Sequence, residues 1–131
     1  MDKTPEVIPV SDTVIQAQVH ALATLIQETE AYRAFIQAYQ AAVNDASVQR
    51  LAAQIREHNR ALQWAEGDFL AHQQALETLQ AEMNALPLMQ TYRQAEAELV
   101  RLFTAVDQEI SAALGLPFAR NARRSGCACG R

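Results

Sequence analysis

Residues 48–86 read VQRLAAQIREHNRALQWAEGDFLAHQQALETLQAEMNAL, and the spacing of their apolar positions decides the fold class. Apolar residues recur every seven positions, at Val48, Ile55, Leu62, Phe69, Leu76 and Met83. A second set follows three positions after each of these, at Leu51, His58, Ala65, His72, Leu79 and Leu86. A heptad pattern sustained in this way predicts a coiled-coil-like helical arm. We expect one helix from about Ser47 to Ala85, on the order of 60 Å long at about 1.5 Å per residue, with a kink at Gly67 allowed but not required.

Two shorter helices are expected before this arm. No Gly or Pro lies between Pro9 and Gly67, and the good helix formers Ala and Gln are abundant there. The first helix should begin near residues 11–13, with an apolar stripe of Ile15, Val19, Leu22 and Ile26. The second should follow the ETE stretch at 28–30, and the capping side chains of NDAS at 44–47 should end it. The chain is therefore predicted to be all-α.

A fourth helix is expected after the turn ALPLMQ at 85–90. Pro87 suits the first position of a helix, where its missing N–H is not needed. The helix should end at Gly115, a residue that favours the left-handed cap, with Pro117 just beyond. We expect the helix over 47–85 to pack against this one as a long antiparallel hairpin. Such a hairpin leaves apolar surface bare unless other helices cover it, which predicts a homo-oligomer, most simply a dimer.

The chain divides into three predicted regions: an N-terminal extension (1–10), a helical domain (11–115) and a flexible basic tail (116–131). Residues 1–116 hold seven basic and fifteen acidic residues, whereas the last fifteen hold four arginines and no acid. Those arginines lack interleaved aromatic residues, so we expect no direct nucleic-acid binding. The sequence has no apolar run long enough to cross a membrane and no signal peptide, which predicts a cytoplasmic protein.

Both cysteines of the chain lie in that tail, as Cys127 and Cys129 in SGCACGR at 125–131. Thiolates are soft ligands for zinc, copper(I) or iron–sulfur clusters. A zinc site or a cluster generally needs four ligands, so this Cys-x-Cys pair needs donors from another chain. Cys127 and Cys129 are our candidate metal and cofactor ligands. The alternative is an exposed thiol pair with no ligand. We do not expect a disulfide between the two cysteines, because its small ring would be strained.

Other chemical candidates are weaker. His58 and His72 are fourteen residues apart on the expected helix, too far to share a metal within one chain, although they could approach each other across an antiparallel partner. We expect polar seam residues that set register. Trp64 lies off the seam, and we expect it to pack under the first two helices. No nucleophile elbow, phosphate loop or catalytic triad is present, and we expect no enzymatic activity.

Two stretches resemble the YlbF/YmcA family of small bacterial regulators. These are TVIQAQVHALATLIQETEAYRAFIQAYQAAVNDASVQRLAAQI at 13–55 and LPLMQTYRQAEAELVRLFTAVDQEISAAL at 86–114. The resemblance covers about residues 12–114, and PLMQTY at 87–92 is its most specific part. Leu86 departs from the family's usual Asn, which weakens the local cap.

The resemblance implies a non-catalytic adaptor that assembles as homo- or hetero-oligomers with paralogous helical partners. Family members act in sporulation, competence and biofilm control, and some join a complex that directs ribonuclease Y in messenger RNA processing. Cysteines of members in that complex help to hold iron–sulfur clusters, although other members lack them. The resemblance therefore implies that Cys127 and Cys129 help to hold an iron–sulfur cluster, or zinc, that is shared with other chains. The alternative functions are a purely structural coiled-coil module and a small soft-metal carrier that uses the same cysteines.

Overall fold

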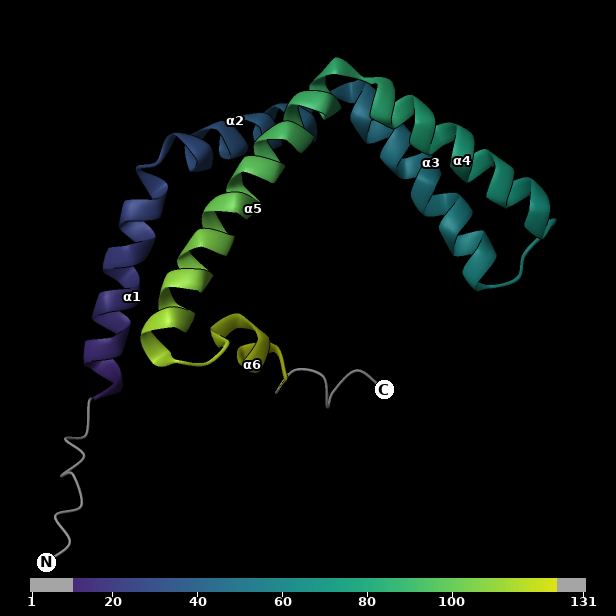
Figure 1. The fold of residues 1–131 in the computed structure, drawn as a ribbon. Coiled ribbons are helices and arrows are strands. Elements are labelled where there is room, and N and C mark those ends of the chain that lie inside the picture. The colour runs from purple at the N-terminus through teal and green to yellow at the C-terminus, as the bar shows by residue number, and fades with distance from the viewer. Residues whose placement is uncertain (1–10, 125–131) are drawn as a thin grey trace, which may run out of the picture.

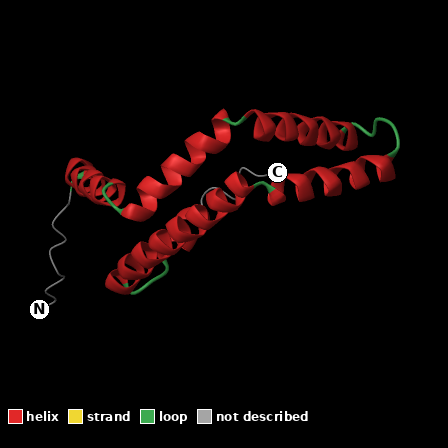
Figure 2. Cartoon of the chain, turned by 90° about the horizontal axis from the view of Figure 1, so that it is seen from above, coloured by secondary structure: helices red, strands yellow, loops and turns green. Residues whose placement is uncertain are grey.

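The computed structural model describes residues 11–124, and every regular element in that range is a helix (Figure 2). The elements are α1 (Asp12–Gln27), α2 (Glu30–Asn44), α3 (Ala46–Gln63), α4 (Phe69–Ala85), α5 (Pro87–Leu114) and α6 (Phe118–Arg124). The all-α prediction is therefore confirmed for the described part of the chain. No helix among these residues is both long enough and apolar enough to cross a membrane.

The helices form two arms that meet at an apex (Figure 1). One arm is the antiparallel pair α3 and α4, and the other holds α1, α2, α5 and α6. The short connections from α2 to α3 and from α4 to α5 both lie at the apex, so the chain enters and leaves the α3–α4 arm at the same end. The result is an open shape in which each arm is only one or two helices thick.

Local sequence explains where most helices begin and end. Ser11, Thr29, Asp45 and Asp68 are N-caps whose side chains accept hydrogen bonds from backbone N–H groups of the first turn. Pro87 opens α5, as expected, and Leu86 before it makes no side-chain cap. Gly115 ends α5 in the left-handed region, with φ 72°.

The prediction of one helix from Ser47 to Ala85 is wrong. The chain reverses at residues 64–68, and α3 and α4 pack against each other as a hairpin. The amide of Glu66 donates to the carbonyl of Ala61 at 2.8 Å, while Ala65 (φ 52°) and Gly67 (φ 72°) take left-handed conformations. This bonding pattern is a Schellman-type end to α3. Most of the heptad seam is covered within the hairpin, where Leu51 and Leu76 are buried, whereas Phe69 beside the turn stays 62% exposed.

The expected hairpin between the third and fourth predicted helices is wrong for the same reason. Once α4 has returned to the apex, α5 runs along the other arm and packs against α2. Phe35 and Tyr92 meet in that contact, with ring centroids 5.6 Å apart. The long antiparallel hairpin and the two shorter N-terminal helices are thus present, but the hairpin is formed within residues 46–85.

The predicted flexible tail from residue 116 is wrong for residues 118–124, which form α6. Two hydrogen bonds hold the start of α6 against α5. The Phe118 amide donates to Ser111 Oγ at 2.9 Å, and the Ala119 amide donates to Asp107 Oδ1 at 3.0 Å. Sequence periodicity could not reveal this short helix, because α6 is held by polar contacts with α5.

Candidate functional site

The predicted ligands Cys127 and Cys129 lie outside the described residues, so their coordination stays a prediction. Within residues 11–124, no group of three or more His, Cys, Asp or Glu side chains is gathered in a way that could hold a metal ion. The described part of this chain therefore offers no closed metal centre, and partner chains would have to complete a site at the two cysteines.

His58 and His72 are brought together by the reversal of the chain. His58 Nδ1 and His72 Nδ1 are 2.8 Å apart, and both side chains are half-buried. The expectation that these residues are too far apart within one chain assumed a continuous helix, and it is wrong. One ring must donate and the other accept in this contact, so at least one of the two imidazoles is neutral. The sequence signal for this pair was the turn-forming EGD at 66–68, which lies between the two histidines.

A cluster of charged side chains lies near the turn of the same hairpin. Arg60 donates hydrogen bonds to Glu57 at 2.7 Å and to Glu66 at 3.0 Å. The hydrogen bond and charge of Arg60 lower the pKa of Glu57, and His58 and His72 add smaller effects in the same direction. All three members of this cluster are largely exposed, so it contributes little to stability. Its carboxylates are engaged by Arg60 and do not point to an acid–base pair.

Helix α1 presents an apolar face that the chain itself barely covers. It has no buried residue, and Ile15 and Val19 are 52% and 58% exposed. Farther along the predicted stripe, Leu22 and Ile26 are half-buried. Leu22 lines an apolar groove that separates α1 from the second half of α5, where Val106 and Ile110 face it. The predicted stripe is thus correct, but its first half has no partner within the described chain.

A second apolar surface lies at the apex. Tyr39 stacks on Phe35 with ring centroids 6.2 Å apart, and Tyr92 completes the cluster. Burial raises the pKa of Tyr92, and a hydrogen bond to Glu96 adds to that effect. Tyr39 and Tyr92 also line an open groove together with Val43, Val48 and Met89. This groove joins α2, α3 and α5 at the point where the two arms meet.

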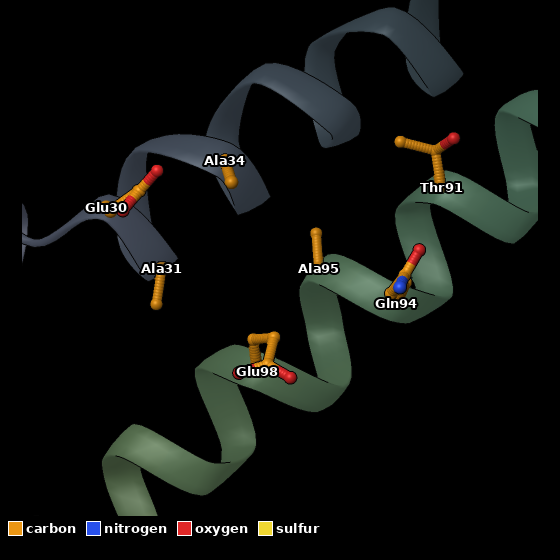
Figure 3. Close-up of a pocket in the computed structure, with 7 residues that line it drawn as sticks. All are labelled: Glu30, Ala31, Ala34, Thr91, Gln94, Ala95 and Glu98. Carbon is orange, nitrogen blue, oxygen red and sulfur yellow. The ribbon is translucent and has the colours of Figure 1, made fainter.

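The contact between α2 and α5 leaves a third groove that differs in character (Figure 3). Its floor consists of small residues, including Ala31, Ala34 and Ala95, which allow the two helices to approach closely. Its polar lining includes Glu30 on α2 and Glu98 on α5. Glu98 is already paired with Arg101. The hydroxyl in its lining, that of Thr91, donates a hydrogen bond to the carbonyl of Pro87 at 3.1 Å, and no histidine lines the groove beside it. The groove therefore resembles packing space between helices more than a catalytic cleft.

Trp64 is not packed under the first two helices, so that expectation is wrong. It caps the C-terminus of α3 at the far end of the hairpin, where 67% of the residue is exposed. Phe69 and Leu70 on the other side of the turn are also mostly exposed. The end of the hairpin therefore carries three large apolar side chains that are mostly exposed.

Together these features define a thin, open helical protein. Among its described residues, more large apolar side chains are exposed than are buried in the core. The model of the family described as "Control of competence regulator ComK, YlbF/YmcA" matches residues 15–115. The chain belongs to the YlbF/YmcA family of regulators, as the sequence resemblance indicated. No curated protein matches the sequence.

A solved structure supports the same fold. The chain is similar to one described as the X-ray crystal structure of Bacillus subtilis RicA in complex with RicF. The two share 16% sequence identity with a TM-score of 0.71, and the match covers 80% of this chain and 96% of the other. At this identity the likeness concerns the fold.

Proposed function

We propose that this protein is a non-catalytic regulatory adaptor that acts by assembling with other helical chains, either a second copy or a paralogue. The observation that carries the proposal is the apolar face of α1, whose sixteen residues include none that is buried. An amphipathic helix gains most of its stability from packing its apolar face. A second chain lying along α1 and the groove beside α5 would supply that packing.

The thin core supports the same proposal. Among the described residues, the buried hydrophobic ones are only Ala38, Ala42, Leu51, Ala61, Leu76 and Leu99. Half of them are alanines, which contribute little apolar area, and the 28-residue α5 has only Leu99 buried. Burying one Val or Ile side chain contributes about 1.5–3 kcal/mol. Ile15 and Val19 are already about half covered, so burying the rest of both side chains would contribute roughly 1.5–3 kcal/mol together. That is a substantial share of the ~5–15 kcal/mol by which a small domain is stable.

The family and the structural neighbour make a helical partner the natural occupant. RicA was crystallised in a complex with RicF. By analogy, we propose a hetero-oligomer or homo-oligomer in the cytoplasm, within a complex that directs ribonuclease Y in messenger RNA processing. In this proposal the protein has no enzymatic activity, and assembly is its mechanism.

Cys127 and Cys129 fit a shared site because they offer two soft thiolates where a cluster or zinc needs four donors. We propose that they contribute to an iron–sulfur cluster, or to zinc, held jointly with partner chains. The cluster would link the subunits, and the residues of this chain would only bind it.

Assembly is tested with a pair of variants on α1. Val19→Glu places a charge on the apolar face, and Ala17→Glu places the same charge on the opposite side of the helix. Light scattering coupled to gel filtration should show that Val19→Glu lowers the mass of the assembly while Ala17→Glu leaves it unchanged. A monomeric parent protein that also recovers no helical partner from its host would contradict the proposal.

The cluster is tested by anaerobic purification. Visible absorbance that is lost in the Cys127→Ser, Cys129→Ser double variant supports a cluster held by the tail. Zinc or copper bound stoichiometrically by the protein alone would instead favour the soft-metal carrier. A colourless, metal-free assembly that is unaffected by the double variant, even with its partners present, would favour the alternative function of a purely structural coiled-coil module.

A further inference from the structure

We propose that His58 and His72 form a second, independent metal site, which binds a divalent transition-metal ion between α3 and α4. The site would use two imidazole ligands from one chain, with water at the remaining positions. It requires neither the tail cysteines nor a partner chain, so it stands apart from the function proposed above.

The distance between the two rings is the main evidence. A metal that binds two nitrogens at about 2.1 Å and at a right angle holds them about 3.0 Å apart. His58 Nδ1 and His72 Nδ1 are 2.8 Å apart, with ring centroids separated by 5.1 Å. The centroids are farther apart than the nitrogens by about the width of one ring, so the two rings lie nearly end to end and their Nδ1 atoms point at each other. Each ring must therefore rotate, and the nitrogens must separate by a few tenths of an ångström, before both can face one ion. Imidazole ligands suit copper(II) and nickel(II).

The hairpin holds both ligands in place. Each histidine lies within a helix, and the turn at 64–68 fixes the two helices relative to each other. Asp68 caps α4 through the amides of Leu70 and Ala71, at 3.0 and 3.4 Å. Gly67 allows the His72 ring to lie close, because a Cβ at that position would be 3.1 Å from His72 Nε2. This preorganisation reduces the entropy lost when a metal binds.

The surroundings leave room for water ligands. His58 lines an open groove with the polar side chains of Gln54, Gln74 and Thr78. Glu57 lies in the same groove, but its carboxylate is held by Arg60 and is not a ligand in this arrangement. On metal binding, the proton shared between the two Nδ1 atoms would move to Nε2 of the ring that carries it, so that both Nδ1 lone pairs are free for the ion. Metal binding would then stabilise the hairpin, because the unfolded chain does not hold the two rings together.

Calorimetry with NiCl2 at pH 7.5 tests the proposal on the untagged, full-length protein carrying Cys127→Ser and Cys129→Ser, which removes the competing thiolates. We expect one nickel ion per chain and at least a tenfold loss of affinity in either His58→Asn or His72→Asn. His20→Asn is the matched control, since His20 is an exposed histidine on α1, and it should leave affinity unchanged. Absence of binding, or equal losses in all three variants, would overturn the site.

A second measurement needs no histidine substitution, which guards against misfolded variants. Copper(II) added in stoichiometric amount to the same protein should give an electron paramagnetic resonance spectrum with superhyperfine splitting from two nitrogens. Nickel should also raise its thermal midpoint. A spectrum with no splitting from two coordinated nitrogens would count against the assignment.

Discussion

The substitution Gly67→Ala distinguishes the hairpin from a continuous helix by the sign of its effect on stability. In an uninterrupted helix over 47–85, replacing a glycine by alanine would stabilise the protein by about 0.8–1 kcal/mol. In the observed turn, Gly67 has φ 72°, a conformation that costs an L-residue roughly 1–2 kcal/mol. The new Cβ would also lie 3.1 Å from His72 Nε2. The smaller entropy of the unfolded chain returns about 0.4–1 kcal/mol. We expect a net destabilisation of about 1 kcal/mol.

Ala65→Gly should move stability in the opposite direction. Ala65 occupies the left-handed position of the Schellman-type end of α3, with φ 52°, where glycine is the usual residue. Relief of roughly 1–2 kcal/mol of backbone strain outweighs a loss of about 0.4–1 kcal/mol to unfolded-chain entropy. This variant should be as stable as the parent or up to about 1 kcal/mol more stable. A continuous helix would instead lose about 0.8–1 kcal/mol.

Urea unfolding followed by far-ultraviolet circular dichroism measures both effects. At a slope of about 1–2 kcal/mol per molar urea, a change of 1 kcal/mol moves the midpoint by roughly 0.5–1 M. All samples need the same protein concentration, because assembly adds a concentration-dependent contribution to stability. A more stable Gly67→Ala together with a less stable Ala65→Gly would refute the reversal at 64–68, and the pairing of His58 with His72 would be refuted with it.

Other predictions concern the core, the caps and α6. Leu51 is 2% exposed, so Leu51→Ala should lower the free energy of unfolding by about 2–5 kcal/mol in the same urea assay, whereas Leu70→Ala, at a position 60% exposed, should change it by no more than about 0.5 kcal/mol. Asp45→Ala removes the 2.9 Å hydrogen bond that caps α3 and should cost about 1 kcal/mol, and an unchanged urea midpoint would show that the cap is dispensable. Asp107→Ala removes a hydrogen-bond acceptor that holds α6 against α5. Trypsin should then cut after Arg120 faster than in the parent protein, while the urea midpoint stays nearly constant. An unchanged cleavage rate would mean that α6 is held by other contacts.

Features set by neighbouring residues could be read from the sequence. Thr29 and Asp45 cap helices because their oxygens reach amides only three residues away. Pro87 and Gly115 mark the ends of α5 because their backbone preferences act locally. The stripe on α1 was also evident from spacing alone, and so was the family. The metal-ligand candidates Cys127 and Cys129 could be proposed from ligand chemistry, but their surroundings depend on chains that this sequence does not contain.

The sequence by itself determined that residues 11–115 form amphipathic helices, because helix propensity, capping and heptad spacing are all short-range properties. The tertiary structure decided which apolar faces meet. A heptad pattern indicates which side of a helix must be covered, but not by what. The second half of the same segment can cover that side as well as a second chain can. That choice rests on the turn at 64–68, where two residues with positive φ reverse the chain. It brings His58 to His72, pairs α2 with α5, and leaves the face of α1 for a partner.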